Sequence, residues 1–125
     1  MKQWKLAVSS ADAAPLTAPI LMIGDVASNV KKAGALGFQA IEVHTREDAD
    51  LDYEGIAKAV AESGCKVGMI ITGRLNTEGK CDLMSDIPYI TKAAIDGMKQ
   101  YIDMAQKIGA EGIVVGWVKG NVPAG

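Results

Sequence analysis

Histidine, cysteine and aromatic residues are scarce in this sequence, and each shortage excludes a class of protein. The 125 residues contain one histidine, His44, two cysteines, Cys65 and Cys81, and only 5% aromatic residues. Two cysteines with this spacing make neither a disulfide framework nor a structural metal site. We therefore expect free thiols in a reducing cytoplasm.

Clustered basic charge and long apolar runs are missing as well. The net charge is −2, and the thirteen lysines and arginines are scattered along the chain. Nucleic-acid binding needs concentrated positive charge, and a membrane span needs about 18 consecutive apolar residues. The N-terminal apolar run is also too short for a signal peptide. The sequence predicts a cytoplasmic protein that binds neither nucleic acid nor membranes.

What is present is typical of one globular domain over residues 1–125. The chain is 49% hydrophobic and 22% charged, close to globular averages. Four short β-type runs alternate with three helical patterns. Asp25 and Asp52 are candidate N-caps, and each helix ends on a glycine, Gly37, Gly64 or Gly109. The expected strands are about 5–10, 40–45, 66–73 and 112–119, and the expected helices run from Asp25 to Leu36, through Ile56–Ala61, and from about Ile87 to Ile108.

Strands that alternate with helices predict a parallel sheet with right-handed crossovers. The segments after the first and third strands are much longer than the usual 2–6 residues. Both leave the carboxyl ends of strands, where α/β folds bind ligands. The fold class is α/β, either a (βα)3β half of a TIM (β/α)8 barrel or a flavodoxin-like parallel sheet. A full barrel takes about 250 residues, roughly twice this length.

Three stretches carry a resemblance to a known family. "LGFQAIEV" (36–43) is similar to the second-strand signature of the xylose-isomerase-like barrels. "GRLNTEGKCDLMSDIP" (73–88) and "YIDMAQKIGAEGIVVGWVKG" (101–120) resemble the third-strand loop and the following helix and strand of its sugar phosphate isomerase/epimerase branch. The resemblance covers nearly the whole chain, which matches the N-terminal half of the family.

The resemblance implies carbohydrate metabolism by a metal-dependent isomerase or epimerase. Such enzymes generally bind one divalent metal (Mn, Mg, Zn or Co) through ligands on the fifth to eighth strands, which this sequence does not contain. We expect no metal to be bound by this chain alone. We further expect the half-barrel to be inactive alone and to pair with a C-terminal half or with a second half-barrel chain, including a homo-oligomer. The implied substrate is a small sugar-like molecule. The alternative is a non-catalytic half-barrel that works by assembly or binding.

The strand around the only histidine carries the candidate catalytic residues. Side chains alternate along a strand, so Ile41 and Val43 share one face while Glu42 and His44 share the other. In a barrel, Glu42 and His44 point into the lumen, with His44 nearest the rim and Glu42 able to orient its ring. The alternatives are a strand-end histidine with a local hydrogen bond and a structural Glu42.

Four further residues are candidates for binding substrate. Arg74 follows the third strand and could bind a phosphate or carboxylate; alternatively it pairs with Glu78 or Asp82. Trp117 and Lys119 alternate to one face at the end of the fourth strand, where they could bind a sugar ring and an anionic oxygen; the alternatives are core packing and a solvated lysine. Ser9 offers a hydroxyl at the same rim.

Overall fold

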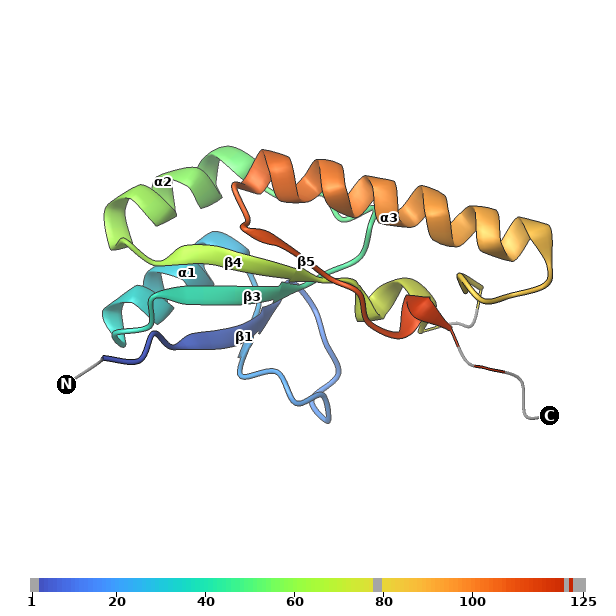
Figure 1. The fold of residues 1–125 in the computed structure, drawn as a ribbon. Helices are drawn as coiled ribbons and strands as arrows, with labels where there is room; N and C mark the ends of the chain where they lie inside the picture. Colours follow the sequence, from blue (N-terminus) through green and yellow to red (C-terminus); the bar gives the residue numbers. More distant parts are fainter. Residues whose placement is uncertain (1–2, 78–79, 121, 123–125) are drawn as a thin grey trace.

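A computed structural model gives the fold of residues 3–77, 80–120 and 122. Strands and helices alternate along the chain (Figure 1). The elements are β1 (Ala7–Ala11), β2 (Met22–Ile23), α1 (Val26–Ala35), β3 (Ala40–His44), α2 (Tyr53–Ser63), β4 (Lys66–Ile71), the 3-10 helix η1 (Thr72–Asn76), α3 (Pro88–Ile108), β5 (Gly112–Val114) and the 3-10 helix η2 (Trp117–Lys119).

The five strands form one all-parallel sheet in the order β2-β1-β3-β4-β5. The predicted parallel α/β fold is confirmed. Strands β1, β3, β4 and β5 lie side by side in chain order, and the two-residue strand β2 lies on the other side of β1. This order is compatible with a segment of a β/α barrel and with a flavodoxin-like sheet. Here α1 packs against α2 and α2 against α3, and Figure 1 shows α2 and α3 above the strands.

The helix-covered face of the sheet holds the core. Ile41, Val43, Val67 and Ile70 are almost completely buried there. Two helices are also fixed to this face by polar contacts. From α1, Asn29 donates to the Ser10 hydroxyl at 3.0 Å, and from α3 the Tyr101 hydroxyl donates to the Thr45 carbonyl at 2.7 Å; these contacts are buried.

The opposite face is left without a helix and carries two rows of side chains. Strand register aligns Ser9, Glu42 and Met69 in one row, and Ala11, His44, Ile71 and Val114 in the next. Glu42, His44 and Ile71 are partly exposed, and Met69 and Val114 are exposed. Glu42 and His44 therefore share a face, opposite the buried Ile41 and Val43, as the alternation predicted.

Both predicted N-caps are confirmed. The Asp25 carboxylate accepts from the Ser28 N–H at 2.8 Å, and the Asp52 carboxylate accepts from the Gly55 N–H at 2.9 Å. These bonds satisfy N–H groups that have no partner within the first turn of a helix.

The fourth predicted strand was wrong in length, because β5 ends at Val114 instead of continuing to residue 119. The buried Thr72 hydroxyl donates to the Val114 carbonyl at 2.8 Å and accepts from the Gly116 N–H at 3.1 Å. The Thr72 side chain thus takes the place of backbone hydrogen bonds between strands beyond Val114, and the chain turns into η2. Trp117 and Lys119 consequently do not alternate on a strand. The third strand likewise stops at Ile71, two residues short of the expected end, where η1 begins.

The short strand β2 was not predicted. It lies in the long segment after β1 and pairs with Ser10 and Ala11 at the edge of the sheet. Among the described residues, no helix has both the length and the apolar character needed to cross a bilayer.

Candidate functional site

The candidate site lies at the carboxyl ends of the strands, where both long connections begin. Parallel strands bring the ends of β1, β3, β4 and β5 to one edge of the sheet. Residues far apart in the sequence therefore meet here, as in other open α/β folds. The residues around this edge are named the rim: Ser9 from β1, Asp12 directly after β1, Glu42 and His44 from β3, and Arg74 from η1.

His44 ends β3 on the open face of the sheet. Burial lowers the pKa of its imidazole below the ordinary value of 6.5, the positive charge of Arg74 lowers it further, and the negative charge of Glu42 acts in the opposite direction. The ring is therefore mostly neutral at pH 7, and a neutral imidazole can accept a proton or a hydrogen bond.

Arg74 joins two parts of the rim that are separated by β3. Its Nη1 atom donates to the Asp12 carboxylate at 3.0 Å and to the Ala13 carbonyl at 2.8 Å. Because β3 lies between β1 and β4 in the sheet, this bridge passes across the end of β3, where His44 is located.

The alternative prediction that Arg74 pairs with Asp82 was wrong, because Arg74 pairs with Asp12. The Asp82 carboxylate instead accepts from the Met84 N–H at 2.7 Å, and Glu78 lies outside the described residues. Asp12 is 62 residues away from Arg74 in the sequence. Local charge spacing could not reveal it, and only the pairing order of the strands brings the two together.

Ser9 contributes to the rim mainly by holding the first connection. Its hydroxyl oxygen accepts from the Leu21 N–H at 3.1 Å, which fixes the chain just before β2. The hydroxyl proton remains available as a donor because the oxygen is the acceptor in this bond.

Trp117 and Lys119 lie in η2 beside η1 rather than on a strand. The Asn76 side chain donates to the Trp117 carbonyl at 3.1 Å, and the Leu83 N–H donates to the Val118 carbonyl at 2.9 Å. Val118 is buried, whereas the Trp117 side chain is 73% exposed. Core packing of Trp117 is therefore excluded, and the indole faces solvent near the carboxyl ends of the strands.

The described residues contain no group of three or more His, Cys, Asp or Glu side chains that could hold a metal ion. Four carboxylates do line a small hollow of about 150 Å³ at this edge, from Asp12, Asp25, Asp50 and Asp52. Three of them already have structural partners: Asp12 binds Arg74, while Asp25 and Asp52 cap helices. The hydrogen bonds from Ser28 lower the pKa of Asp25.

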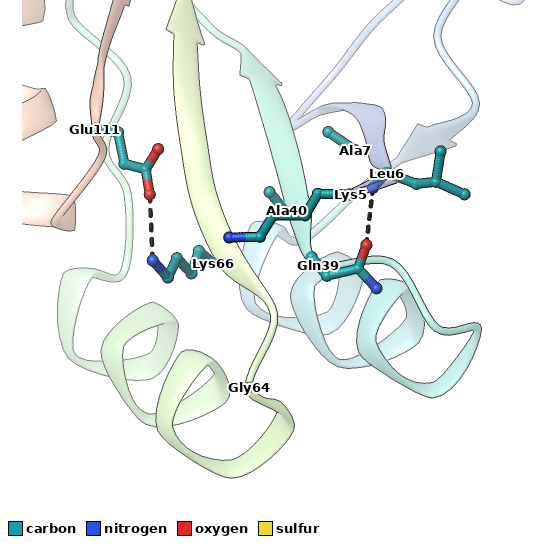
Figure 2. A pocket seen from close by; sticks show the side chains of 8 residues that line it. All are labelled: Lys5, Leu6, Ala7, Gln39, Ala40, Gly64, Lys66 and Glu111. Atoms are coloured by element: carbon teal, nitrogen blue, oxygen red, sulfur yellow. Dashed lines mark hydrogen bonds and ion pairs between the residues drawn. The ribbon is translucent and has the colours of Figure 1, made fainter. Parts of the chain in front are cut away.

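A larger hollow of about 340 Å³ lies at the opposite, amino end of the sheet (Figure 2). Lys66 and Glu111 form an ion pair there at 3.2 Å, and the Gln39 side chain accepts from the Leu6 N–H at 2.8 Å. This end of a β/α fold generally contributes stability, while ligands bind at the carboxyl end. The volume of the hollow alone would favour the amino end. We place the candidate site at the rim because the carboxyl ends of the strands meet there and because the rim carries His44 and Arg74.

No model of a known protein family matches the sequence, and no curated protein is significantly similar to it.

Proposed function

We propose that this chain is the N-terminal half of a xylose-isomerase-like β/α barrel that acts on a sugar or sugar phosphate in the cytoplasm. The complete barrel would move a proton next to a carbonyl group, with a divalent metal polarising the substrate oxygens. His44 and Glu42 belong to its pocket, with Arg74, Ser9, Trp117 and Lys119 as substrate-binding residues.

The observation that carries this proposal is the open face of the sheet. Four adjacent parallel strands have their helices on one side, and Glu42 and His44 line the other side in adjacent rows. A barrel encloses this face as its lumen, with catalytic groups at the carboxyl ends of the strands. A neutral His44 beside the charged Arg74 is suited to proton transfer next to a polarised carbonyl.

The residues described in this chain do not fit the divalent metal by themselves, because they bring together no set of three ligands. We therefore assign no step of the reaction to a metal bound here. In the proposed enzyme, the metal ligands come from a partner that covers the open face, either a C-terminal half or a second half-barrel chain.

The decisive experiment follows proton exchange with solvent. The chain is mixed with the C-terminal half of a barrel from this superfamily, and ketoses and ketose phosphates are incubated in D2O with Mn²⁺ or Mg²⁺. We expect deuterium to enter the carbon next to the carbonyl, and His44→Ala to slow this exchange about 100-fold, as for loss of a general acid–base group. Arg46→Gln is the control. Equal exchange in the His44→Ala and Arg46→Gln proteins would contradict the role of His44.

A second candidate function is a non-catalytic module that works by assembly or binding, favoured by the apolar side chains at the β5 edge. Val114, Val115 and Trp117 are exposed next to the uncovered face, and an unpaired strand edge is a site for pairing with another chain. Sedimentation and metal titration separate the two functions. A stable monomer of 13.1 kDa that binds no divalent metal favours a binding module, whereas co-sedimentation with a second half of similar size favours the enzyme.

A further inference from the structure

Only one nitrogen of the Arg74 guanidinium, Nη1, donates in the contacts that hold the side chain. Nη1 carries two N–H groups, and both have acceptors, Asp12 and the Ala13 carbonyl. Among the described residues, the remaining donors on Nε and Nη2 have no hydrogen-bond partner. The side chain is 28% exposed, so solvent molecules and ligands can reach it.

The free donors form one edge of a planar group. Nε and Nη2 present two parallel N–H bonds, which match the two oxygens of a carboxylate or phosphate. Because Asp12 and Ala13 hold the opposite corner, the orientation of this edge is set before any ligand arrives. Preorganisation of this kind lowers the entropy lost on binding.

We infer that Asp12 is a positioning residue that fixes the Arg74 guanidinium, and that the free Nε–Nη2 edge binds an oxyanion of the ligand across the end of β3. The shared chemistry is a pair of anionic oxygens, from a phosphate or from a carboxylate. The rim belongs to the isomerase site proposed above, and the identity of the natural ligand rests on that function. Oxyanion binding itself requires no turnover.

Two effects of Asp12 on an anion oppose each other. Its negative charge repels the ligand, while its hydrogen bond holds the arginine in place. Asp12→Asn and Asp12→Ala both remove the charge, but only asparagine retains a side-chain oxygen that can accept from Nη1. The pair of variants therefore isolates the positioning effect.

The test is calorimetric titration of the chain with inorganic phosphate and, separately, with glycolate at low ionic strength. Tighter binding of phosphate or of glycolate identifies the preferred oxyanion. We expect Asp12→Ala to bind the preferred anion about fivefold more weakly than Asp12→Asn, the effect of one lost hydrogen bond. Equal affinities in these two variants would overturn the positioning role.

Two substitutions at the arginine test the binding edge itself. Arg74→Gln should weaken binding about tenfold or more, and Arg74→Lys should lie between it and the unchanged protein, because lysine keeps the charge but not the fork. The matched control is Arg46→Gln, the other arginine of the chain. Full affinity in Arg74→Lys, or no binding of either anion to the unchanged chain, would overturn the oxyanion edge. Circular dichroism verifies that each variant is folded. Anion binding by the chain, together with no isomerisation in the mixture with the C-terminal half, would reject the proposed enzyme while retaining the Arg74 site.

Discussion

The strands β4 and β5 are linked by side chains at both ends, and the two links differ in burial. At the amino end, Lys66 and Glu111 form an ion pair whose side chains are 65% and 63% exposed. At the carboxyl end, the completely buried Thr72 hydroxyl bridges Val114 and Gly116. Both links lie at ends of the same pair of strands, yet only the buried link fixes the path of the following segments, η1 and η2.

This difference shows how the fold separates rigid support from an accessible site. Thr72 fixes the paths of η1 and η2, and Arg74 and Trp117 project from these two segments. At the amino end, the hollow of Figure 2 is larger, but its ion pair lies in solvent, where such pairs contribute little. The rim thus differs from the amino end by the buried Thr72 hydrogen bonds beneath it, and not by the size of its hollow.

The largest effect is expected from Thr72→Val, which keeps the shape of the side chain but removes its hydroxyl. The Gly116 N–H and the Val114 carbonyl each lose a partner, so the free energy of unfolding should fall by about 1–3 kcal/mol. Urea unfolding followed by circular dichroism measures the change. Thr77→Val, at an exposed threonine, is the control and should change stability by less than about 0.5 kcal/mol. Equal losses in both variants would remove the contrast between buried and exposed links.

An intermediate effect is expected from pH, through His44. Its pKa in the folded chain is lower than the ordinary 6.5, so the unfolded chain takes up a proton more readily. Stability should therefore decrease as the pH falls from about 7 to about 5. His44→Gln removes this part of the pH dependence, and Arg74→Gln reduces it by raising the pKa of His44. NMR titration of the imidazole and urea unfolding at several pH values measure both; the same pH dependence in the His44→Gln protein would contradict it.

The smallest effect is expected at the amino end. Glu111→Gln breaks the exposed ion pair with Lys66, and we expect the free energy of unfolding to change by about 0.5 kcal/mol or less. Added salt should shrink the difference further, because screening weakens exposed pairs. A loss as large as that of Thr72→Val would mean that both ends of the strand pair are equally important for stability.

Much of the fold could be predicted from local patterns. Helix periodicity, the caps Asp25 and Asp52, and the alternation of Glu42 with His44 depend on neighbours a few residues away, and the structure has all of them. The end of β5 could not be predicted, because the apolar run through Trp117 has strand character and only the distant Thr72 interrupts the ladder.

The location of the rim could be predicted from the sequence, but the contact between Arg74 and Asp12 could not. The long connections after the first and third strands indicated the correct edge of the sheet, and Arg74 was a candidate because it follows the third strand. Its pairing with Asp12 depends on β3 lying between β1 and β4. Sequence spacing does not carry that information, since the strand order is a property of the folded sheet.

The close approach of η2 to η1 has a consequence for variation. A side chain at Gly116 would place its Cβ 3.1 Å from the Gly73 Cα, against backbone that has little room to move. The neighbouring Trp117 faces solvent. In a library randomised at both positions and selected for folded protein, position 116 should be enriched in glycine, while position 117 should return a broad range of residues. Two adjacent codons would thus mark the boundary between a position that must keep its shape and a position that is free to acquire a new ligand.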